Sequence, residues 1–292
     1  MPSKFPEDTR LLIEEALRRY FPQTTCPETI YEAMKHSLFS GGKRFRAVLV
    51  VESAKVFGGR AEDVLPTACA VEYIHTYSLI HDDLPAIDND DLRRGVSTCH
   101  VAFGEDIAIL AGDALYSEAF RLISTLQKAN DPQSIIQVIR ELATASGVSG
   151  MVGGQVVDIQ SEGKTVDEET LRFIHEKKTG ELIKASVRSG AILACASNRE
   201  LEVLTDYATN LGLAFQITDD VLDIVGDTAI LGKTAGSDAR RGKVTYPAVF
   251  GLKKSEEMAK IMVDRAKDAL KRLNRNTDTL ADLADFVYER RF

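Results

Sequence analysis

The sequence predicts an all-helical protein. Apolar residues recur at three- and four-residue spacing through long stretches that also contain good helix formers. Few segments show the polar and apolar alternation typical of strands. Helices are therefore expected over 11–20, 46–57, 63–81, 106–126, 134–146, 170–196, 201–225 and 255–273.

Turn residues fall between these segments, at 57–59, 129–132, 162–164 and 231–242. Asp131 before Pro132 predicts a helix start, as does Asp167 followed by two glutamates, because the helix dipole favours negative charge there. No low-complexity linker, compositional shift or clear repeat divides the chain. We therefore expect one domain over residues 1–292.

Composition excludes several classes of function. The 292 residues carry 36 basic and 44 acidic side chains, a net charge of -8, so no electrostatic signature for nucleic acid is present. The four cysteines form no C-x-x-C pair, which argues against a zinc site or a disulfide framework and for reduced thiols. Neither a signal peptide nor a membrane-spanning run is apparent, so a cytoplasmic protein is expected.

The segment Ser78–Gly95, SLIHDDLPAIDNDDLRRG, gathers five aspartates. Two carboxylates about 4 Å apart repel by roughly 4 kcal/mol at an effective dielectric of about 20, so such a cluster calls for a cation. Oxygen ligands without cysteine or histidine suggest magnesium, manganese or calcium, and magnesium commonly shares its coordination with substrate phosphates. Pro85 should end the preceding helix near Leu84, so that Asp88 folds back from a loop. The following aspartates lack the Gly and Glu of an EF-hand calcium loop.

A second acidic segment, FQITDDVLDIVGD, covers residues 215–227. Its polar residues fall within about 100° of the helix circumference; they are Gln216, Asp219, Asp220, Asp223 and Asp227. The apolar residues between them, Ile217, Val221, Leu222, Ile224 and Val225, predict buried flanks, with the acidic stripe facing a cavity. A solvated polar face is the alternative.

Three basic segments could bind phosphate. The first is the Gly-rich turn 40–46, SGGKRFR, which leads into a helix beginning near Ala47. The others are Arg93-Arg94 and the basic loop 231–243. Each alone is more typical of a surface turn. Thr179-Gly180 interrupts a strong helical pattern, where a break could expose a carbonyl or hydroxyl group, although one tolerated glycine explains it equally well.

Taken together, these motifs closely resemble the trans-prenyltransferases, the short-chain polyprenyl diphosphate synthases. The resemblance runs through nearly the whole chain: GGKRFR, EYIHTYSLIHDDLPAIDNDDLRRG, AGDAL, GGQVVD, EKKTG, FQITDDVLD, LGKTAGSD and GKVTYP occur in the family's order and at about its spacing. One departure is Ala47, where the family usually has Pro; this should loosen a helix start without removing a phosphate ligand.

The resemblance implies an isoprenoid synthase helical bundle, usually a homodimer, with both aspartate motifs facing a deep central cavity. About three Mg²⁺ ions, or Mn²⁺ as a substitute, are implied. Their implied ligands are Asp82, Asp83, Asp88, Asp219, Asp220 and Asp223. Allylic diphosphate contacts are implied for Arg93, Lys178, Thr179, Gln216, Lys233 and Lys243, and isopentenyl diphosphate contacts for Lys43, Arg46, His75 and Arg94. The roles closest to catalysis are implied for Asp82, Asp83, Asp88, Lys178, Asp219 and Lys233.

The implied reaction ionises an allylic diphosphate, and the isopentenyl double bond then attacks the cation. Stabilisation of the departing diphosphate by positive charge contributes most to catalysis in this reaction. Tyr77, fifth before Asp82, stands at the family's floor position beside Ser78, and Pro85-Ala86 resembles the bacterial farnesyl type. An ideal helix places Tyr77 about 140° from Asp82, so geometry alone does not predict this role. Farnesyl diphosphate is the expected product, with geranylgeranyl diphosphate as the alternative.

Two other classes share parts of this pattern. A class I terpene cyclase would not need the Gly-Gly-Lys-Arg turn, and its second metal motif normally includes Asn, Ser or Thr. A non-catalytic subunit of a heteromeric synthase typically lacks one aspartate motif, and both are present here.

Overall fold

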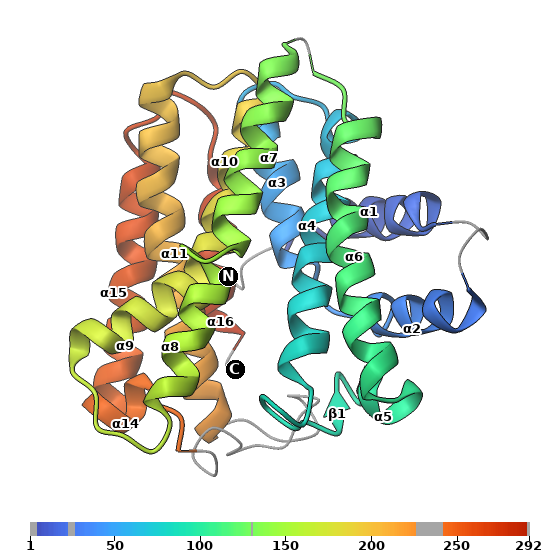
Figure 1. Cartoon of the computed structure of the whole chain (residues 1–292). Helices are drawn as coiled ribbons and strands as arrows, with labels where there is room; N and C mark the ends of the chain where they lie inside the picture. The colour runs from blue at the N-terminus through green and yellow to red at the C-terminus, as the bar shows by residue number, and fades with distance from the viewer. Residues whose placement is uncertain (1–4, 23–26, 130, 226–241, 291–292) are drawn as a thin grey trace.

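Helices make up nearly all the regular structure in the computed structural model, which describes residues 5–22, 27–129, 131–225 and 242–290 (Figure 1). In the first half of the chain they are α1 (Glu7–Tyr20), α2 (Glu28–Leu38), α3 (Phe45–Val56), α4 (Ala61–Asp82), α5 (Cys99–Phe103), α6 (Glu105–Leu126) and α7 (Pro132–Ser146). The rest are α8 (Met151–Ser161), α9 (Glu168–His175), the π-helix η1 (Glu176–Gly180), α10 (Glu181–Leu193), α11 (Asn198–Val225), α14 (Tyr246–Phe250), α15 (Leu252–Leu270) and α16 (Asp278–Glu289). The prediction of an all-helical fold is confirmed.

The core lies around α3, which is buried on all sides. Four consecutive residues, 48–51, have no exposed surface, as expected for a helix enclosed by others. A side chain at Gly190 of α10 would place its Cβ 1.9 Å from the Val50 carbonyl oxygen, so glycine allows α10 and α3 to approach closely. Outside this centre, α4 packs along α6 and α11 packs along α15.

Two helix starts follow the prediction from capping residues. The Asp131 carboxylate accepts a hydrogen bond from the backbone N–H of Gln133 at 3.0 Å, and Pro132 occupies the first turn. The Asp167 carboxylate accepts one from the N–H of Thr170 at 2.8 Å. Both aspartates satisfy donors that the first helical turn leaves unpaired.

Other parts of the fold differ from expectation. Helices α2, α5, α8, α14 and α16 were not predicted, and neither was the short antiparallel hairpin of β1 (Leu92–Arg93) and β2 (Val96–Ser97). The expected burial of Ile224 and Val225 is wrong, since their exposed fractions are 53% and 49%. They lie at the end of α11, where only the face that carries Asp220 and Asp223 is buried.

The bundle brings the last turns of α4 and α11 to the same end of the molecule, at the bottom of Figure 1, together with β1, α5 and α14. Both aspartate segments therefore meet at one end, although over 130 residues separate them in sequence. Within the described ranges, no helix combines the length and apolar content needed to cross a bilayer. A single domain over 1–292 stays a prediction.

Candidate active site

A cavity of about 930 Å³ opens between the C-terminal part of α4 and the helices α8, η1 and α11. Most of the residues predicted for the site line it. They are Lys43, Arg46, His75, Tyr77, Ser78, Asp82, Asp88, Arg93, Arg94, Lys178, Thr179, Gln216, Asp219, Asp220 and Lys243. The stripe on α11 therefore faces a cavity, and the alternative of a solvated surface stripe is excluded for these residues.

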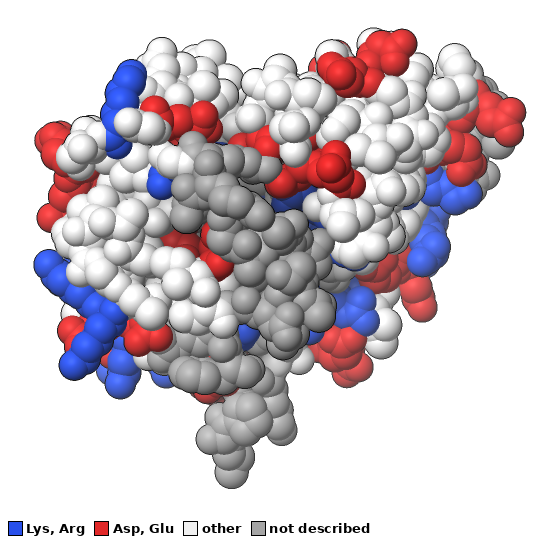
Figure 2. All heavy atoms as spheres, turned by 90° about the horizontal axis from the view of Figure 1, so that it is seen from below, with Lys and Arg blue, Asp and Glu red and all other residues white. Residues whose placement is uncertain are grey.

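Figure 2 shows the end of the molecule at which these segments meet. Acidic side chains are visible both near the middle of this face and around its edge, and basic side chains stand mainly toward the edge. Lys233 and Asp227 lie outside the described residues, as does most of the basic loop 231–243.

The first aspartate segment adopts the shape that Pro85 predicts. Helix α4 ends at Asp82, and the chain folds back so that the backbone N–H of Asp88 donates to the Asp82 carbonyl at 2.7 Å. Asn89 takes a left-handed conformation with φ 49°, and its N–H donates to the Leu84 carbonyl. This turn directs Asp82 and Asp88 toward the same cavity.

Asp83 is placed differently from Asp82. Its carboxylate is buried and accepts hydrogen bonds from Arg93 Nε at 2.8 and 2.9 Å, away from the cavity lining. Burial raises the pKa of Asp83 to about 6, although Arg93 opposes the shift. Helix α4 ends at Asp82, and Arg93 draws the Asp83 carboxylate away from the cavity lining. The metal-ligand role implied for Asp83 stays a prediction.

In the second aspartate segment, Asp220 accepts hydrogen bonds from two donor groups and lies beside a buried histidine. Its oxygens accept hydrogen bonds from the Gln216 amide and the Tyr246 backbone N–H, both at 2.9 Å. The His175 Nε2 atom lies 3.5 Å away, and the ring stacks on Tyr246 with centroids 5.1 Å apart. Burial lowers the pKa of His175 to about 3, so this imidazole is neutral at physiological pH.

Asp219 and Asp223 have different surroundings. Asp219 pairs with Arg290 at 2.7 Å, and Arg290 also donates to the Phe215 carbonyl at 2.8 Å. Asp223 is buried and does not line the cavity. Asp219 and Asp220 are thus the members of this segment that face Asp82 and Asp88 across the cavity.

The carboxylates that line the cavity are suitable ligands for divalent metal ions. Burial raises the pKa of Asp82, and neighbouring Asp88 raises it further, so a cation placed near this pair would relieve an unfavourable charge. Yet no three acidic, histidine or cysteine side chains within the described ranges converge closely enough to hold a metal unaided. This arrangement suits magnesium, which completes its coordination with water and substrate phosphates.

The π-helix η1 presents Lys178 and Thr179 to the cavity, at the break that the sequence marks. Helix α8 lies directly against it, because a Cβ at Gly154 would come 2.3 Å from the Lys178 backbone nitrogen. Lys178 donates to Asp158 at 2.7 Å, and the Thr179 hydroxyl donates to the Gln216 Oε1 atom at 2.6 Å. Burial alone would lower the pKa of Lys178, but the carboxylates of Asp82, Asp158 and Asp88 raise it, so the ammonium stays charged.

A second group of basic side chains lines the cavity beside α4. Burial lowers the pKa of Arg46, and it lowers that of Arg94 to about 10. The pKa of His75 falls well below its ordinary value through burial and through the nearby arginines. This group therefore offers two guanidinium cations and one neutral ring to an anion.

Several cavity residues were assigned no role from the sequence. Asp158 and Gln155 belong to the GGQVVD motif, and both atoms of the Gln155 amide are buried without a hydrogen-bond partner. Arg290 lies beyond every recognised motif, and only the fold brings it to Asp219. The motif was the available signal for Asp158 and Gln155, whereas no sequence pattern marked Arg290.

Comparison with known proteins decides the family. Residues 27–283 match the polyprenyl synthetase family. The chain belongs to this family. It is 46% identical to the geranylgeranyl diphosphate synthase of Cyanophora paradoxa, over 96% of this chain and 93% of the relative. It is also 46% identical to the farnesyl diphosphate synthase of Escherichia coli (strain K12), over 98% of this chain and 99% of the relative.

A solved structure of a polyprenyl synthetase relative, the FPP/GFPP synthase of Zymomonas mobilis, has a TM-score of 0.83 to this chain. The two are 36% identical, with 97% of this chain and 95% of the other covered. The predictions of a short-chain trans-prenyl synthase fold and of prenyltransferase activity are thereby confirmed. Synthases of this family use divalent metal ions.

Proposed function

We propose that this prenyltransferase condenses isopentenyl diphosphate with dimethylallyl or geranyl diphosphate and releases farnesyl diphosphate. One observation carries the proposal: residues of both aspartate segments and a separate basic group beside α4 line the same cavity. An allylic diphosphate suits the first region, where Lys178, Lys243 and Arg93 stand among the carboxylates. Isopentenyl diphosphate suits the second, with Lys43, Arg46, His75 and Arg94.

Asp82, Asp88, Asp219 and Asp220 would hold the metal ions from the cavity walls, and Asp83 and Asp223 would join them by reorienting. Bound Mg²⁺, about three ions, would neutralise charge on the allylic diphosphate as it departs. Lys178 is fixed by Asp158 at 2.7 Å and stays protonated, so it offers positive charge where negative charge develops. The cavity holds both substrates side by side, and this removes much of the entropic barrier to their reaction.

The allylic cation needs a polar but unreactive environment. The Thr179 hydroxyl and the Gln216 amide form a fixed chain that ends on Asp220. Their oxygens can stabilise positive charge, while Phe215 and the apolar side of α8 exclude water. Loss of a proton from the condensed cation then completes the reaction, with the released diphosphate as the acceptor.

An aromatic stack that begins at Tyr77 in the cavity wall is the feature that would limit product length. Tyr77 lines the cavity, and its ring packs on Tyr116 and His81 with centroids 4.9 and 5.0 Å apart. Phe120 packs on Tyr116 in turn at 5.2 Å. We expect this stack to stop growth at fifteen carbons. Geranylgeranyl diphosphate is the alternative product, since a relative of equal identity carries that name.

A homodimer is the proposed assembly. Val101, Ile109 and Leu110 on the adjacent helices α5 and α6 have exposed fractions of 49%, 45% and 54%, which suits a surface that a second copy covers. Light scattering coupled to gel filtration tests this assembly. A monomer at micromolar concentration would contradict it.

The reaction is tested with radiolabelled isopentenyl diphosphate and each allylic starter, with and without magnesium. Label should enter a longer, acid-labile diphosphate only when both substrates and the metal are present. A cyclase would instead convert an allylic diphosphate to a hydrocarbon without isopentenyl diphosphate. A non-catalytic subunit would form no product.

A further inference from the structure

The turn between α2 and α3 contains one arginine that does not face the cavity. Lys43 and Arg46 line the cavity, but Arg44 between them is buried, with an exposed fraction of 2%. Arg44 caps α3 in the left-handed conformation, φ 53°, which is disfavoured for a residue with a Cβ. Such a conformation persists when surrounding contacts require it.

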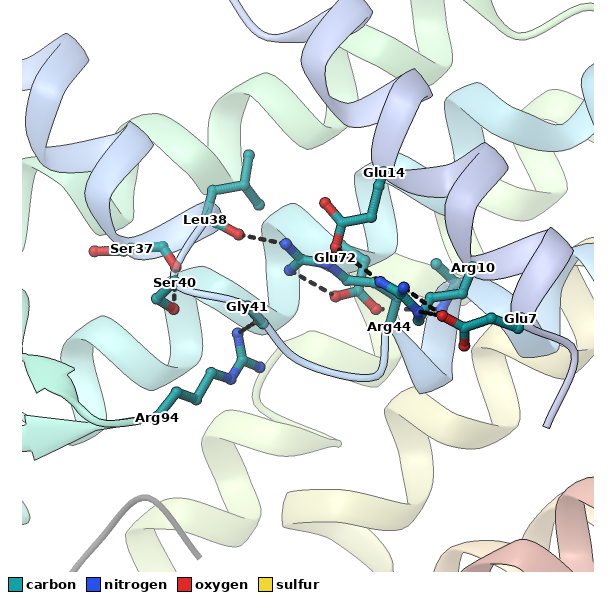
Figure 3. Close-up of polar contacts among 11 residues, drawn as sticks. Glu7, Arg10, Glu14, Ser37, Leu38, Ser40, Gly41, Arg44, Glu72 and Arg94 are labelled. Atoms are coloured by element: carbon teal, nitrogen blue, oxygen red, sulfur yellow. Dashed lines mark hydrogen bonds and ion pairs between the residues drawn. The ribbon is translucent and has the colours of Figure 1, made fainter. Parts of the chain in front are cut away.

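Those contacts come from three other helices (Figure 3). Arg44 Nε donates to Glu14 of α1 at 2.7 Å, and Nη2 donates to the Leu38 carbonyl at the end of α2, also at 2.7 Å. Its Nη1 atom lies 3.6 Å from Glu72 of α4. One guanidinium therefore fixes the start of α3 against α1, α2 and α4.

Glu72 also stabilises the start of α3. Its carboxylate accepts a hydrogen bond at 3.3 Å from the backbone N–H of Ala47, one of the donors that the first turn of α3 leaves unpaired. Glu72 also raises the pKa of Arg46 and Arg94 against the stronger effect of burial. Three guanidinium groups, those of Arg44, Arg46 and Arg94, thus share the two carboxylates of Glu14 and Glu72, which leaves net positive charge for an anion.

The opposite side of the turn rests on Arg94. Its guanidinium donates to the Gly41 carbonyl, and a Cβ on Gly42 would come 2.8 Å from its Cζ atom. Gly41 and Gly42 have φ of 100° and 121°, which suits glycine. The turn is therefore held between Arg94 on one side and the Arg44 contacts on the other (Figure 3).

We propose that Arg44 is a positioning residue for the isopentenyl diphosphate site, acting through Lys43 and Arg46 and held by Glu14 and Glu72. This inference rests on the proposed function, because it assigns the second diphosphate to Lys43 and Arg46. Arg44 touches no substrate. Arg44 sets the direction in which Lys43 and Arg46 enter the cavity. Helix α1 thereby contributes to the isopentenyl diphosphate site through Glu14.

The test separates the Michaelis constants of the two substrates. Arg44→Lys keeps the charge but replaces the planar fork with one ammonium nitrogen, which cannot occupy the separate positions from which Nε, Nη2 and Nη1 reach Glu14, Leu38 and Glu72. We expect KM for isopentenyl diphosphate to rise about tenfold, with KM for the allylic diphosphate within about twofold of wild type. Arg188→Lys is the matched control: Arg188 also joins helices through its guanidinium, with a bidentate pair to Glu141 at 2.9 and 2.7 Å, but does not line the cavity.

Glu14→Gln provides a milder variant if Arg44→Lys does not fold. It weakens one contact of Arg44 from a position nearer the surface, and we expect the same substrate selectivity with about a threefold rise in KM. Equal changes in both KM values, or no change in either variant that folds, would overturn the proposal. Effects of the same size in Arg188→Lys would do so as well.

Titration calorimetry with isopentenyl diphosphate alone, without an allylic substrate, measures binding independently of turnover. Weaker binding in Arg44→Lys supports the positioning role, and unchanged binding contradicts it. Failure of wild-type protein to bind isopentenyl diphosphate would instead refute the proposed function itself. The two failures are thus distinguishable.

Discussion

The ammonium of Lys243 lies 2.8 Å from an oxygen of the Asp88 carboxylate, although 155 residues separate the two in sequence. The pair joins the loop after α4 to the segment before α14 beside the cavity. A bound diphosphate and its metal ions would compete for both partners. Under the proposed function, substrate and metal would replace this internal contact.

Lys243→Met tests this pairing. Loss of the ammonium should raise KM for the allylic diphosphate about tenfold, with a much smaller effect on KM for isopentenyl diphosphate, because Lys243 stands among the carboxylates. Lys254→Met is the control, since Lys254 stacks on Phe250 outside the cavity. Steady-state kinetics with one substrate saturating measures both constants. Parallel changes in the two variants would count against the assignment.

Asp82→Asn separates a catalytic role from a structural one. We expect kcat to fall at least about a hundredfold, because the side chain could no longer help bind the metal ions that neutralise the leaving diphosphate. Burial raises the pKa of Asp82, so the folded protein disfavours its charge, and the neutral amide should leave the melting temperature unchanged or higher.

Asp113→Asn, on the exposed surface of α6, is the control for both measurements on Asp82→Asn. A large loss of stability in Asp82→Asn together with a loss of activity would point to a structural role instead. Magnesium titration of the activity adds a second check. Asp82→Asn should need a higher magnesium concentration for half-maximal rate.

Tyr77→Ala should lengthen the product, because it removes a ring that lines the cavity and packs on Tyr116. Chromatography of the dephosphorylated products measures the change as a shift from fifteen to twenty or more carbons. Tyr31→Ala is the matched control, since Tyr31 packs on Phe21 and does not line the cavity. An unchanged product distribution in Tyr77→Ala would refute the floor role.

His75 predicts a dependence of stability on pH. Burial and nearby arginines lower its pKa in the folded protein, so the unfolded chain binds the proton more readily. The stability that the neutral ring contributes is present above the unfolded pKa of about 6.5 and is lost as pH falls toward the lower folded pKa. Between pH 7 and 5.5 wild type should lose about 1 kcal/mol more free energy of unfolding than His75→Gln. Urea titrations without substrate measure this difference, and identical slopes would contradict it.

The sequence was sufficient where local chemistry determines structure. Pro85 predicted the end of α4 and the return of Asp88, and Asp131 and Asp167 predicted two helix starts. The period of α11 likewise placed Asp219 and Asp220 on one cavity wall. In each case the deciding contacts lie within a few residues of one another.

The remaining features depend on contacts between distant segments. Asp83 turns away from Asp82 because Arg93 returns on a hairpin that no local pattern marked. Arg44 and Arg290 gain their roles from Glu14 and Asp219, which lie 30 and 71 positions away in sequence. Burial of Ile224 and Val225 was wrongly expected because helical period alone does not show where packing against α11 ends.

Identification of the final product formed from dimethylallyl diphosphate and excess isopentenyl diphosphate with magnesium is the decisive measurement for the proposed reaction. Farnesyl diphosphate should accumulate, and chelation of the metal should abolish its formation. Geranylgeranyl diphosphate as the main product would contradict the proposed floor at Tyr77. Absence of any condensed product would contradict the two-diphosphate site itself.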